Sequence, residues 1–246
     1  MIPKVLHYCW FGRGPLPELA ERCIASWRRY LPDYEIRRWD EDSFDVDAIP
    51  YTRTAYAAGK YAFVSDYARF WILYRYGGLY FDTDVEVIRP LDDLLKAGPF
   101  MGFEQDGRDG RPAVNLGLGL AAPAGMPLYR EILDRFEKMV FLSPDGSMNP
   151  YTMIPMVTDL LMQKGLKGGC GIEDVAGVKV YPPSWFNPFD DATGRLRKTP
   201  DTRSIHWYAK SWLPAERPAA VAAKRVLRRI FGTKAVIRMG NLFKRR

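Results

Sequence analysis

The stretch that most constrains this chain is residues 61–88, YAFVSDYARFWILYRYGGLYFDTDVEVI. Apolar side chains recur at helical spacing through residues 63–74, which predicts a helix with one buried face. The double glycine at 77–78 supplies the left-handed backbone that commonly ends a helix. Residues 80–87 then alternate with period two and predict a strand. A helix that stops at a glycine pair and passes at once into a strand favours an α/β fold.

The predicted strand carries two aspartates, Asp82 and Asp84, which share one face with Glu86. Two carboxylates in this position can bind one hard divalent cation, and a diphosphate can complete its shell. Two further Asp-x-Asp pairs lie in the acidic run at 39–47, WDEDSFDVD, which has no apolar pattern and is typical of a solvated loop. The alternative for Asp82 and Asp84 is a half-exposed strand with a polar outer face.

Charged residues head the apolar stripe of the predicted helix. Asp66 and Arg69, in the motif SDYAR, are three residues apart and share a helical face with Phe70 and Leu73. An exposed ion pair at this spacing contributes only about 0.3 kcal/mol, so stability is a weak reason for it. Binding the hydroxyls of a sugar is a stronger reason.

The chain has the composition of an ordinary enzyme domain. Its 246 residues are 47% hydrophobic, which is enough for one sizeable core. No run approaches about 18 consecutive apolar residues, and the N-terminus lacks a signal-peptide pattern, so we expect neither a spanning helix nor export. Cys9, Cys23 and Cys170 have no metal-type spacing and predict free thiols in a reducing compartment.

The positive charge is concentrated at the C-terminal end. Ten of the 36 Lys and Arg residues follow Glu216 and none of the 29 acidic residues does, which leaves 26 basic and 29 acidic residues in 1–216. Within 217–246, one helical face is apolar and basic residues surround it; the apolar positions are Val226, Leu227, Ile230 and Phe231. We expect this tail to lie on an anionic membrane surface. The alternative is a last helix packed on the domain, and nucleic-acid binding is disfavoured because basic and aromatic residues do not alternate through the body.

The rest of the pattern alternates helices and strands, which predicts an α/β layer with a mostly parallel sheet whose ligands bind beyond the carboxyl ends of its strands. Residues 143–200 are rich in Pro, Gly, Ser and Asn and predict loops that shape one side of the site. We expect strands at 4–10 and 34–39 and near Val85, Phe100 and Leu118, and helices at 16–30, at 52–76 with a break at Gly59, and at 128–140.

Four motifs occur in a fixed order along the chain: IPKVLHYCWFG, SDYAR, GGLYFDTDV and HWYAKSW. In this combination the chain resembles the DxD-containing sugar transferases, a family that includes the yeast initiating mannosyltransferase and bacterial capsule and lipopolysaccharide enzymes. The glucosyltransferase domain of the large clostridial toxins is similar at the same motifs. The resemblance spans residues 2–213. It implies the nucleotide-sugar-binding fold called GT-A, in a catalytic domain at 1–216 that is followed by the basic helical tail at 217–246.

The resemblance also implies roles for single residues. Asp82, Asp84 and His206 would hold Mn²⁺ or Mg²⁺, and the imidazole favours Mn²⁺. The residues implied in donor binding are Cys9, Trp10, Ser65, Asp66, Arg69, Tyr80, Asp82, Lys210, Ser211 and Trp212. Those implied in catalysis are Asp66, Arg69, Asp82, Asp84 and Asn115.

Several of these residues also have a purely structural explanation. Trp10 would stack on the nucleotide base, but a tryptophan in an apolar strand is most often core. His206 would otherwise be a hydrogen-bonded histidine between aromatic residues. Asn115 would lie near the reacting carbon or simply form a turn. Tyr80 would contact the ribose, the loop from Lys210 would close over the phosphates, and His7 is expected to be structural.

Together these features predict a metal-dependent glycosyltransferase that moves a hexose from a nucleotide-diphosphate sugar to a hydroxyl of a surface glycan: capsule, lipopolysaccharide or exopolysaccharide. The resemblance implies that this transfer retains the anomeric configuration. A UDP-sugar is the favoured donor and GDP-mannose the alternative. The acceptor is a glycan or lipid-linked glycan at the cytoplasmic, inner face of a bacterial plasma membrane. Three alternatives stay open: an effector-like protein glycosyltransferase, a nucleotide-sugar hydrolase or nucleotidyltransferase, and a non-catalytic basic peripheral membrane protein.

Overall fold

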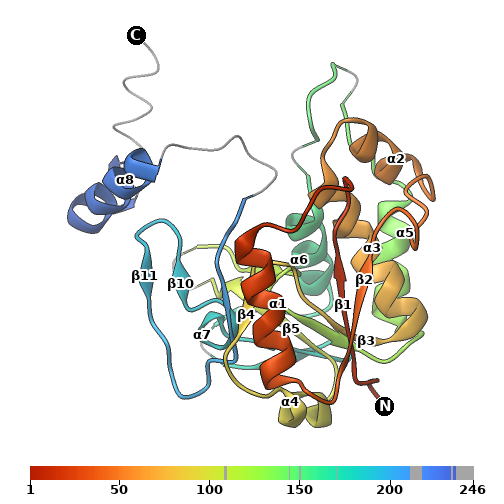
Figure 1. Ribbon diagram of the computed structural model, residues 1–246, viewed down its shortest axis with the longest axis horizontal. Coiled ribbons are helices and arrows are strands. Elements are labelled where there is room, and N and C mark those ends of the chain that lie inside the picture. Colours follow the sequence, from red (N-terminus) through yellow and green to blue (C-terminus); the bar gives the residue numbers. More distant parts are fainter. Residues whose placement is uncertain are drawn as a thin grey trace.

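The computed structural model describes residues 1–107, 110–143, 145–149, 151–169, 171–210, 218–233 and 235–236. Within these ranges the chain forms an eight-stranded central sheet with strand order β2-β1-β3-β7-β5-β9-β8, and β6 pairs with β5 (Figure 1). Its strands are β1 Val5–Cys9, β2 Glu35–Trp39, β3 Gly78–Tyr80, β5 Phe100–Gln105, β6 Ala113–Asn115, β7 Leu120–Ala122, β8 Glu173–Val175 and β9 Val178–Tyr181. Two small sheets pair β4 Val85–Val87 with β12 Ser204–His206, and β10 Phe189–Asp190 with β11 Arg195–Leu196.

Most of the central strands run in one direction. Strand β1 is parallel to β2 and β3, and β7 runs antiparallel to both β3 and β5. Therefore β5 and its parallel partner β9 run the same way as β1. Of the eight strands found in the described ranges, β2, β1, β3, β5 and β9 share a direction. The predicted α/β fold with a mostly parallel sheet is confirmed.

Helices cover both faces of this sheet. They are α1 Glu18–Tyr30, α2 Pro50–Ala57, α3 Tyr61–Tyr76, α4 Asp92–Ala97, α5 Pro127–Phe136, α6 Met153–Gln163, α7 Pro183–Phe186 and α8 Pro218–Phe231. Alternate side chains of a strand enter different cores: Leu79 packs in the cluster that contains α1 and α7, and Tyr80 in the cluster that contains α3, α5 and α6. The break predicted at Gly59 separates α2 from α3.

The glycine pair after α3 ends the helix and admits the next strand. Gly77 has φ 66° and donates its N–H to the Leu73 carbonyl at 2.9 Å. Gly78 has φ 109°, and a Cβ there would lie 2.5 Å from the Val5 carbonyl oxygen. A side chain at this position would therefore push β3 away from β1, and only glycine allows the pairing.

His7 belongs to the same junction and has the structural role expected for it. It is fully buried, its Nε2–H donates to the Gly77 carbonyl at 3.0 Å, and its Nδ1 accepts from Trp39 Nε1 at 3.0 Å. Burial lowers the pKa of His7 to about 4. A neutral imidazole thus ties β1 to β2 and to the end of α3.

Two sequence predictions are wrong. The strand predicted at 80–87 is broken: Asp82 donates its N–H to the Gly117 carbonyl and accepts from the Val85 N–H, so both aspartates lie in the connection between β3 and β4 rather than on one strand face with Glu86. The loops predicted at 143–200 contain α6, α7 and strands β8 to β11. Helix α6 was hidden by the Pro- and Gly-rich residues around it, although its apolar side chains are buried.

The C-terminal segment is described only in part. Helix α8 lies apart from the central sheet, beside the β10–β11 hairpin (Figure 1). The predicted domain boundary at 216 falls outside the described residues. No helix in the described ranges is long and apolar enough to cross a membrane. Cys9 and Cys23 are buried free thiols, whereas Cys170 falls outside those ranges.

Candidate functional site

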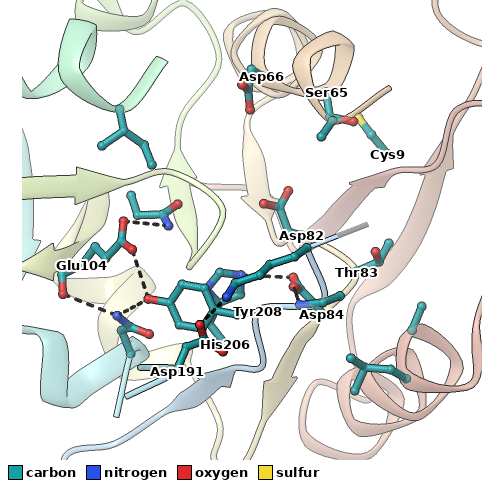
Figure 2. Close-up of a pocket in the computed structure, with 18 of the residues that line it drawn as sticks. Cys9, Ser65, Asp66, Asp82, Thr83, Asp84, Glu104, Asp191, His206 and Tyr208 are labelled. Atoms are coloured by element: carbon teal, nitrogen blue, oxygen red, sulfur yellow. Dashed lines mark hydrogen bonds and ion pairs between the residues drawn. The ribbon is translucent and has the colours of Figure 1, made fainter. Parts of the chain in front are cut away.

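A cavity of about 1110 Å³ opens beyond the carboxyl ends of β1 and β5. Single-ligand pockets usually measure about 300–1,000 Å³, so this one has room for an extended ligand. Its lining brings together residues from segments far apart in the chain (Figure 2), among them Cys9, Trp10, Ser65, Asp66, Arg69, Asp82, Asp84, Glu104, Asn115, Asp191, His206, Tyr208 and Lys210. The edge of the sheet at which α/β proteins bind ligands is therefore also the edge at which the predicted residues meet.

Arg69 joins two of the predicted aspartates. Its Nη2 lies 3.0 Å from Asp66 Oδ1 and 3.1 Å from Asp82 Oδ1, and its Nε donates to the Ser65 carbonyl. The side chain is 3% exposed, and its Nη1 has no hydrogen-bond partner among the described residues. Burial opposes the charge, but Asp82 and Asp66 more than offset this and keep the pKa of Arg69 above its ordinary value. A buried donor without a partner would be satisfied by a ligand hydroxyl.

The two carboxylates beside Arg69 differ in their surroundings. Burial raises the pKa of Asp66 to about 7, although Arg69 opposes this, and the nearby charge of Asp82 adds to it. Asp82 is more open, with its side chain 31% exposed, and it accepts a hydrogen bond from the Tyr80 hydroxyl at 3.1 Å. Tyr80 itself is 1% exposed, and the Arg69 guanidinium lies over its ring. Its predicted contact with a ribose stays a prediction.

Asp84 forms a second centre with His206. Asp84 Oδ1 lies 3.3 Å from His206 Nε2, and Oδ2 accepts the Ala209 N–H at 2.7 Å. Burial alone would raise the pKa of Asp84, but His206 and this amide more than offset it, so the pKa lies below its ordinary value. Burial would likewise lower the pKa of His206, and the Asp84 charge instead raises it. His206 is therefore held by a carboxylate and is more than a packed ring between aromatic residues.

The chemistry of these side chains fits a divalent cation, because carboxylates and an imidazole are ligands that Mn²⁺ accepts. His206 Nδ1 is buried and has no hydrogen-bond partner in the described part of the chain. The three side chains are nevertheless not gathered: among the described residues, no group of three His, Cys, Asp or Glu is placed to hold a metal ion. The assignment of Asp82, Asp84 and His206 as ligands stays a prediction.

The loop after β12 crosses this site in a strained conformation. Tyr208 and Lys210 have φ values of 53° and 52°, and a left-handed backbone costs non-glycine residues about 1–3 kcal/mol each. Contacts hold the loop in place: the Tyr208 hydroxyl donates to Glu104 at 3.2 Å and accepts from Asn187 at 2.7 Å. The predicted residues Ser211 and Trp212 lie outside the described residues.

Other predicted residues line the cavity as well. Cys9 is buried next to Tyr80, and burial raises the pKa of its thiol to about 12, so it is no nucleophile. Trp10 is half-buried: it packs against the core cluster that contains α1, donates its Nε1–H to the Gly14 carbonyl and also lines the cavity. Asn115 donates to Glu104 at 3.2 Å and accepts the Gly117 N–H at 2.9 Å.

Sequence reasoning missed two acidic residues of the site. Glu104 binds both Asn115 and Tyr208 and so connects the β6 end to the loop over the cavity. Its position at the end of a predicted strand near Phe100 was a usable signal, because ligands bind at strand ends. Asp191 lies in the turn between β10 and β11 and contacts Lys210. No pattern in the sequence points to it.

Comparison with known proteins agrees with two of the four motifs, SDYAR and GGLYFDTDV, which lie within the matched residues. Residues 17–101 match the family described as "Glycosyltransferase sugar-binding region containing DXD motif". Inositol phosphoceramide mannosyltransferase 3 of Schizosaccharomyces pombe is 35% identical over 101 residues, 38% of this chain and 27% of the relative. Mannosyl phosphorylinositol ceramide synthase CSH1 of Saccharomyces cerevisiae is 30% identical over 109 residues, 41% of this chain and 28% of the relative.

Two solved structures overlay on the chain at low identity. The PaToxG glycosyltransferase is 20% identical, with a TM-score of 0.47 over 67% of this chain and 70% of that one. The galactosyltransferase LgtC, solved with donor and acceptor sugar analogs, is 16% identical, with a TM-score of 0.44 over 90% of this chain and 94% of that one.

Residues 17–101 are thus similar to the sugar-binding region of glycosyltransferases. The resemblance to DXD-containing sugar transferases that the motifs implied is confirmed over residues 17–101, and the Asp-x-Asp pair of this region directly follows β3. The match covers little more than a quarter of the length of the two curated relatives. The activity of the whole chain is therefore a matter for proposal.

Proposed function

We propose that this protein transfers a hexose from a nucleoside-diphosphate sugar to the hydroxyl group of a glycan or lipid-linked glycan, with a divalent cation and with retention of configuration. One observation carries the proposal. The buried Asp66–Arg69–Asp82 cluster and the Asp84–His206 pair, which come from separate segments, line the same cavity. A stability role alone gives little reason to place so many charges in one cavity, because burying charges is costly.

The Asp66–Arg69–Asp82 cluster and the Asp84–His206 pair have different roles in this proposal. Arg69 and Asp66 would hold hydroxyls of the transferred sugar, because Arg69 keeps one unsatisfied donor and Asp66 offers acceptor oxygens on the same wall. Asp84, Asp82 and His206 are the residues that would hold Mn²⁺ or Mg²⁺, which when bound neutralises the charge of the leaving diphosphate. Lys210, at the cavity edge, would add a second positive charge there. The positions of Trp10 and Asn115 in the lining support base stacking and contact near the reacting carbon.

The names of the curated relatives refine the choice of donor. Both name mannose transfer to an inositol-containing ceramide, so GDP-mannose joins the UDP-sugars as a donor of equal interest. They also favour a lipid-linked acceptor. An effector-like transferase that modifies a protein differs only in this acceptor, and a nucleotide-sugar hydrolase would need none.

The test is release of nucleoside diphosphate from a panel of UDP- and GDP-sugars with Mn²⁺, with Mg²⁺ and with a chelator. Asp84→Ala should abolish release, since its carboxylate is central to the second centre. Asp42→Asn is the matched control: Asp42 belongs to another Asp-x-Asp pair, and its exposed carboxylate forms an ion pair with Arg13. Full activity of Asp84→Ala would exclude the role of Asp84. Release that is unchanged by every added acceptor would favour the hydrolase.

We further propose that the 217–246 segment contacts an anionic membrane at the inner face of a bacterial plasma membrane. The arginines of α8 contact the hairpin, while its apolar side chains are exposed: Val226 50%, Leu227 44%, Ile230 66% and Phe231 58%. An apolar helix face in a segment without acidic residues suits an anionic bilayer.

Co-sedimentation with vesicles tests this contact. The protein should bind vesicles of phosphatidylglycerol and phosphatidylethanolamine and should lose this binding in the double variant Ile230→Ser, Phe231→Ser. Equal binding by the variant would contradict the proposed membrane face.

A further inference from the structure

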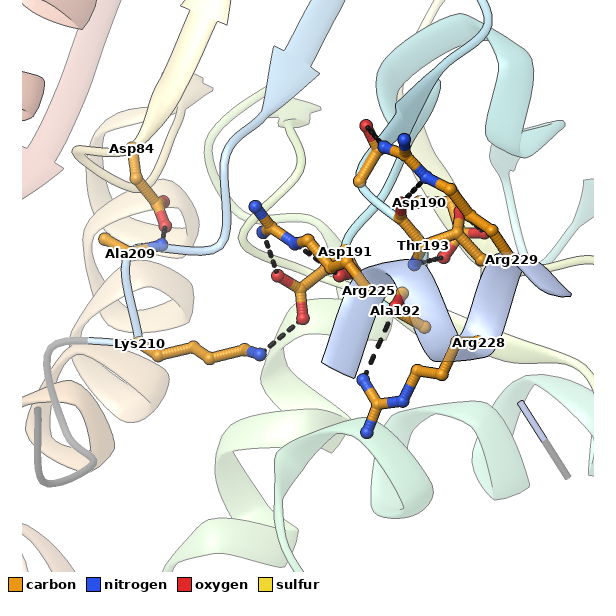
Figure 3. Close-up of polar contacts among 11 residues, drawn as sticks. Asp84, Asp190, Asp191, Ala192, Thr193, Ala209, Lys210, Arg225, Arg228 and Arg229 are labelled. Carbon is orange, nitrogen blue, oxygen red and sulfur yellow. Dashed lines mark hydrogen bonds and ion pairs between the residues drawn. The ribbon is translucent and has the colours of Figure 1, made fainter. Parts of the chain in front are cut away.

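Asp191 connects the cavity to helix α8. Its Oδ2 contacts the Nζ of Lys210, and its Oδ1 lies 3.0 Å from Nη2 of Arg225 (Figure 3). Arg225 Nε also donates to the Asp191 backbone carbonyl at 3.2 Å. One carboxylate is therefore shared by a lysine at the cavity and an arginine on a helix outside it.

Lys210 is better placed than Arg69 to bind an incoming diphosphate. Arg69 is 3% exposed and already engaged by two carboxylates, whereas the Lys210 side chain is 45% exposed and lines the cavity. Lys210 follows Ala209, whose N–H binds Asp84. It is also one of the two residues of this loop with positive φ, so the loop that carries it is held by its contacts rather than by backbone preference.

We propose that Asp191 holds Lys210 when no donor is bound and gives it up to the donor diphosphate, while Arg225 neutralises the carboxylate that Lys210 leaves behind. This inference rests on the proposed function, because it requires a diphosphate in the cavity. Arg225 is then a positioning residue for donor binding although it lies on α8, outside the cavity.

Charge explains why the arginine is needed. A diphosphate carries more negative charge than one carboxylate and therefore competes well for a single ammonium group. Once Lys210 has moved, Asp191 would face the diphosphate as an uncompensated negative charge on the edge of the same cavity, and the two would repel each other. The Arg225 guanidinium binds both the carboxylate and the backbone carbonyl of Asp191, and its positive charge removes this repulsion.

The proposal predicts opposite effects for the two partners. Arg225→Gln should weaken nucleoside-diphosphate binding about threefold to tenfold, as expected for loss of one partly exposed charge interaction. It should raise the donor KM by the same factor and leave kcat unchanged. Asp191→Asn should bind the diphosphate as tightly as the wild type or more tightly, because Lys210 is then free. The double variant should behave like Asp191→Asn, since no carboxylate is left to neutralise.

Arg229→Gln is the matched control. Arg229 lies on the same helix and binds the same hairpin, but through the backbone carbonyls of Thr193 and Gly194 rather than through Asp191. It should leave diphosphate binding unchanged. Unfolding temperatures of all four variants show whether the hairpin stays folded.

The experiment is calorimetric titration of the full chain with UDP and GDP in the presence of Mn²⁺. Weak binding by Arg225→Gln alone, restored in the double variant, is the expected result. Weak binding by both Arg225→Gln and the double variant would mean that the contacts of Asp191 with Arg225 and Lys210 are only structural, and would overturn the inference. If the wild type binds and Arg225→Gln equals it, Asp191 does not govern Lys210 and only this inference fails. If the wild type binds neither nucleotide, the proposed function itself fails, and the inference with it.

Discussion

The removal of Arg69 tests most of the site at once. At an effective dielectric constant of about 20, each carboxylate near 3 Å attracts the guanidinium by about 5 kcal/mol before the cost of desolvation. Removal of one partner from a buried ion pair usually costs about 3–5 kcal/mol, because the other charge is left buried and unpaired. Arg69→Met should therefore lower the free energy of unfolding by about 3–5 kcal/mol, measured in urea by circular dichroism.

Second substitutions show where this cost arises. Asp66 is the less exposed carboxylate, at 15% against 31% for Asp82. Adding Asp66→Asn to Arg69→Met should therefore recover more stability than adding Asp82→Asn. The exposed pair of Arg130 and Asp134 supplies the control, and Arg130→Met should cost less than about 1 kcal/mol. If Arg69→Met is as mild as Arg130→Met, the cluster is not the buried centre described above.

Three further predictions concern single residues. Because burial lowers the pKa of His7 to about 4 in the folded chain, the free energy of unfolding should fall as pH drops from about 6.5 to about 4, by about 3 kcal/mol in total. The difference in unfolding free energy between wild type and His7→Gln should change over the same pH range. A difference that does not depend on pH would contradict this prediction. A Cβ on Gly117 would lie 1.9 Å from Asp82 Oδ2, so Gly117→Ala should displace that side chain and reduce diphosphate release about tenfold or more. Full activity of this variant would refute the role of Asp82. Trp10→Ala should weaken nucleoside-diphosphate binding by about 1–3 kcal/mol in calorimetry, and unchanged affinity would remove the stacking role.

Local signals made the first half of the site predictable. The helical spacing of the apolar residues in α3 and the glycine pair after it are local features of the sequence, and the structure has both within the predicted range. The same signals misplaced Asp82 and Asp84 on a continuous strand. The turn that separates β3 from β4 depends on the Gly117 carbonyl, which is 35 residues further along the chain. No alternation within 80–87 could reveal that partner.

The remaining contacts could not be predicted because they join distant segments. Arg69 and Asp66 were predicted as neighbours on one helix face, but the contact of Arg69 with Asp82 depends on how β3 packs against α3. Likewise, Asp191 meets Arg225 only because α8 packs on the hairpin by its arginines. The sequence showed that α8 is amphipathic, yet it could not show which of the two faces contacts the protein.

The most direct test of the central claim is anomalous diffraction from a crystal grown with Mn²⁺ and the nucleoside diphosphate of the active donor. The account predicts one strong manganese peak bonded to the Asp84 carboxylate and to the diphosphate, inside the cavity that Arg69 and Trp10 line. A manganese ion bound away from Asp84, or a nucleotide outside this cavity, would contradict it.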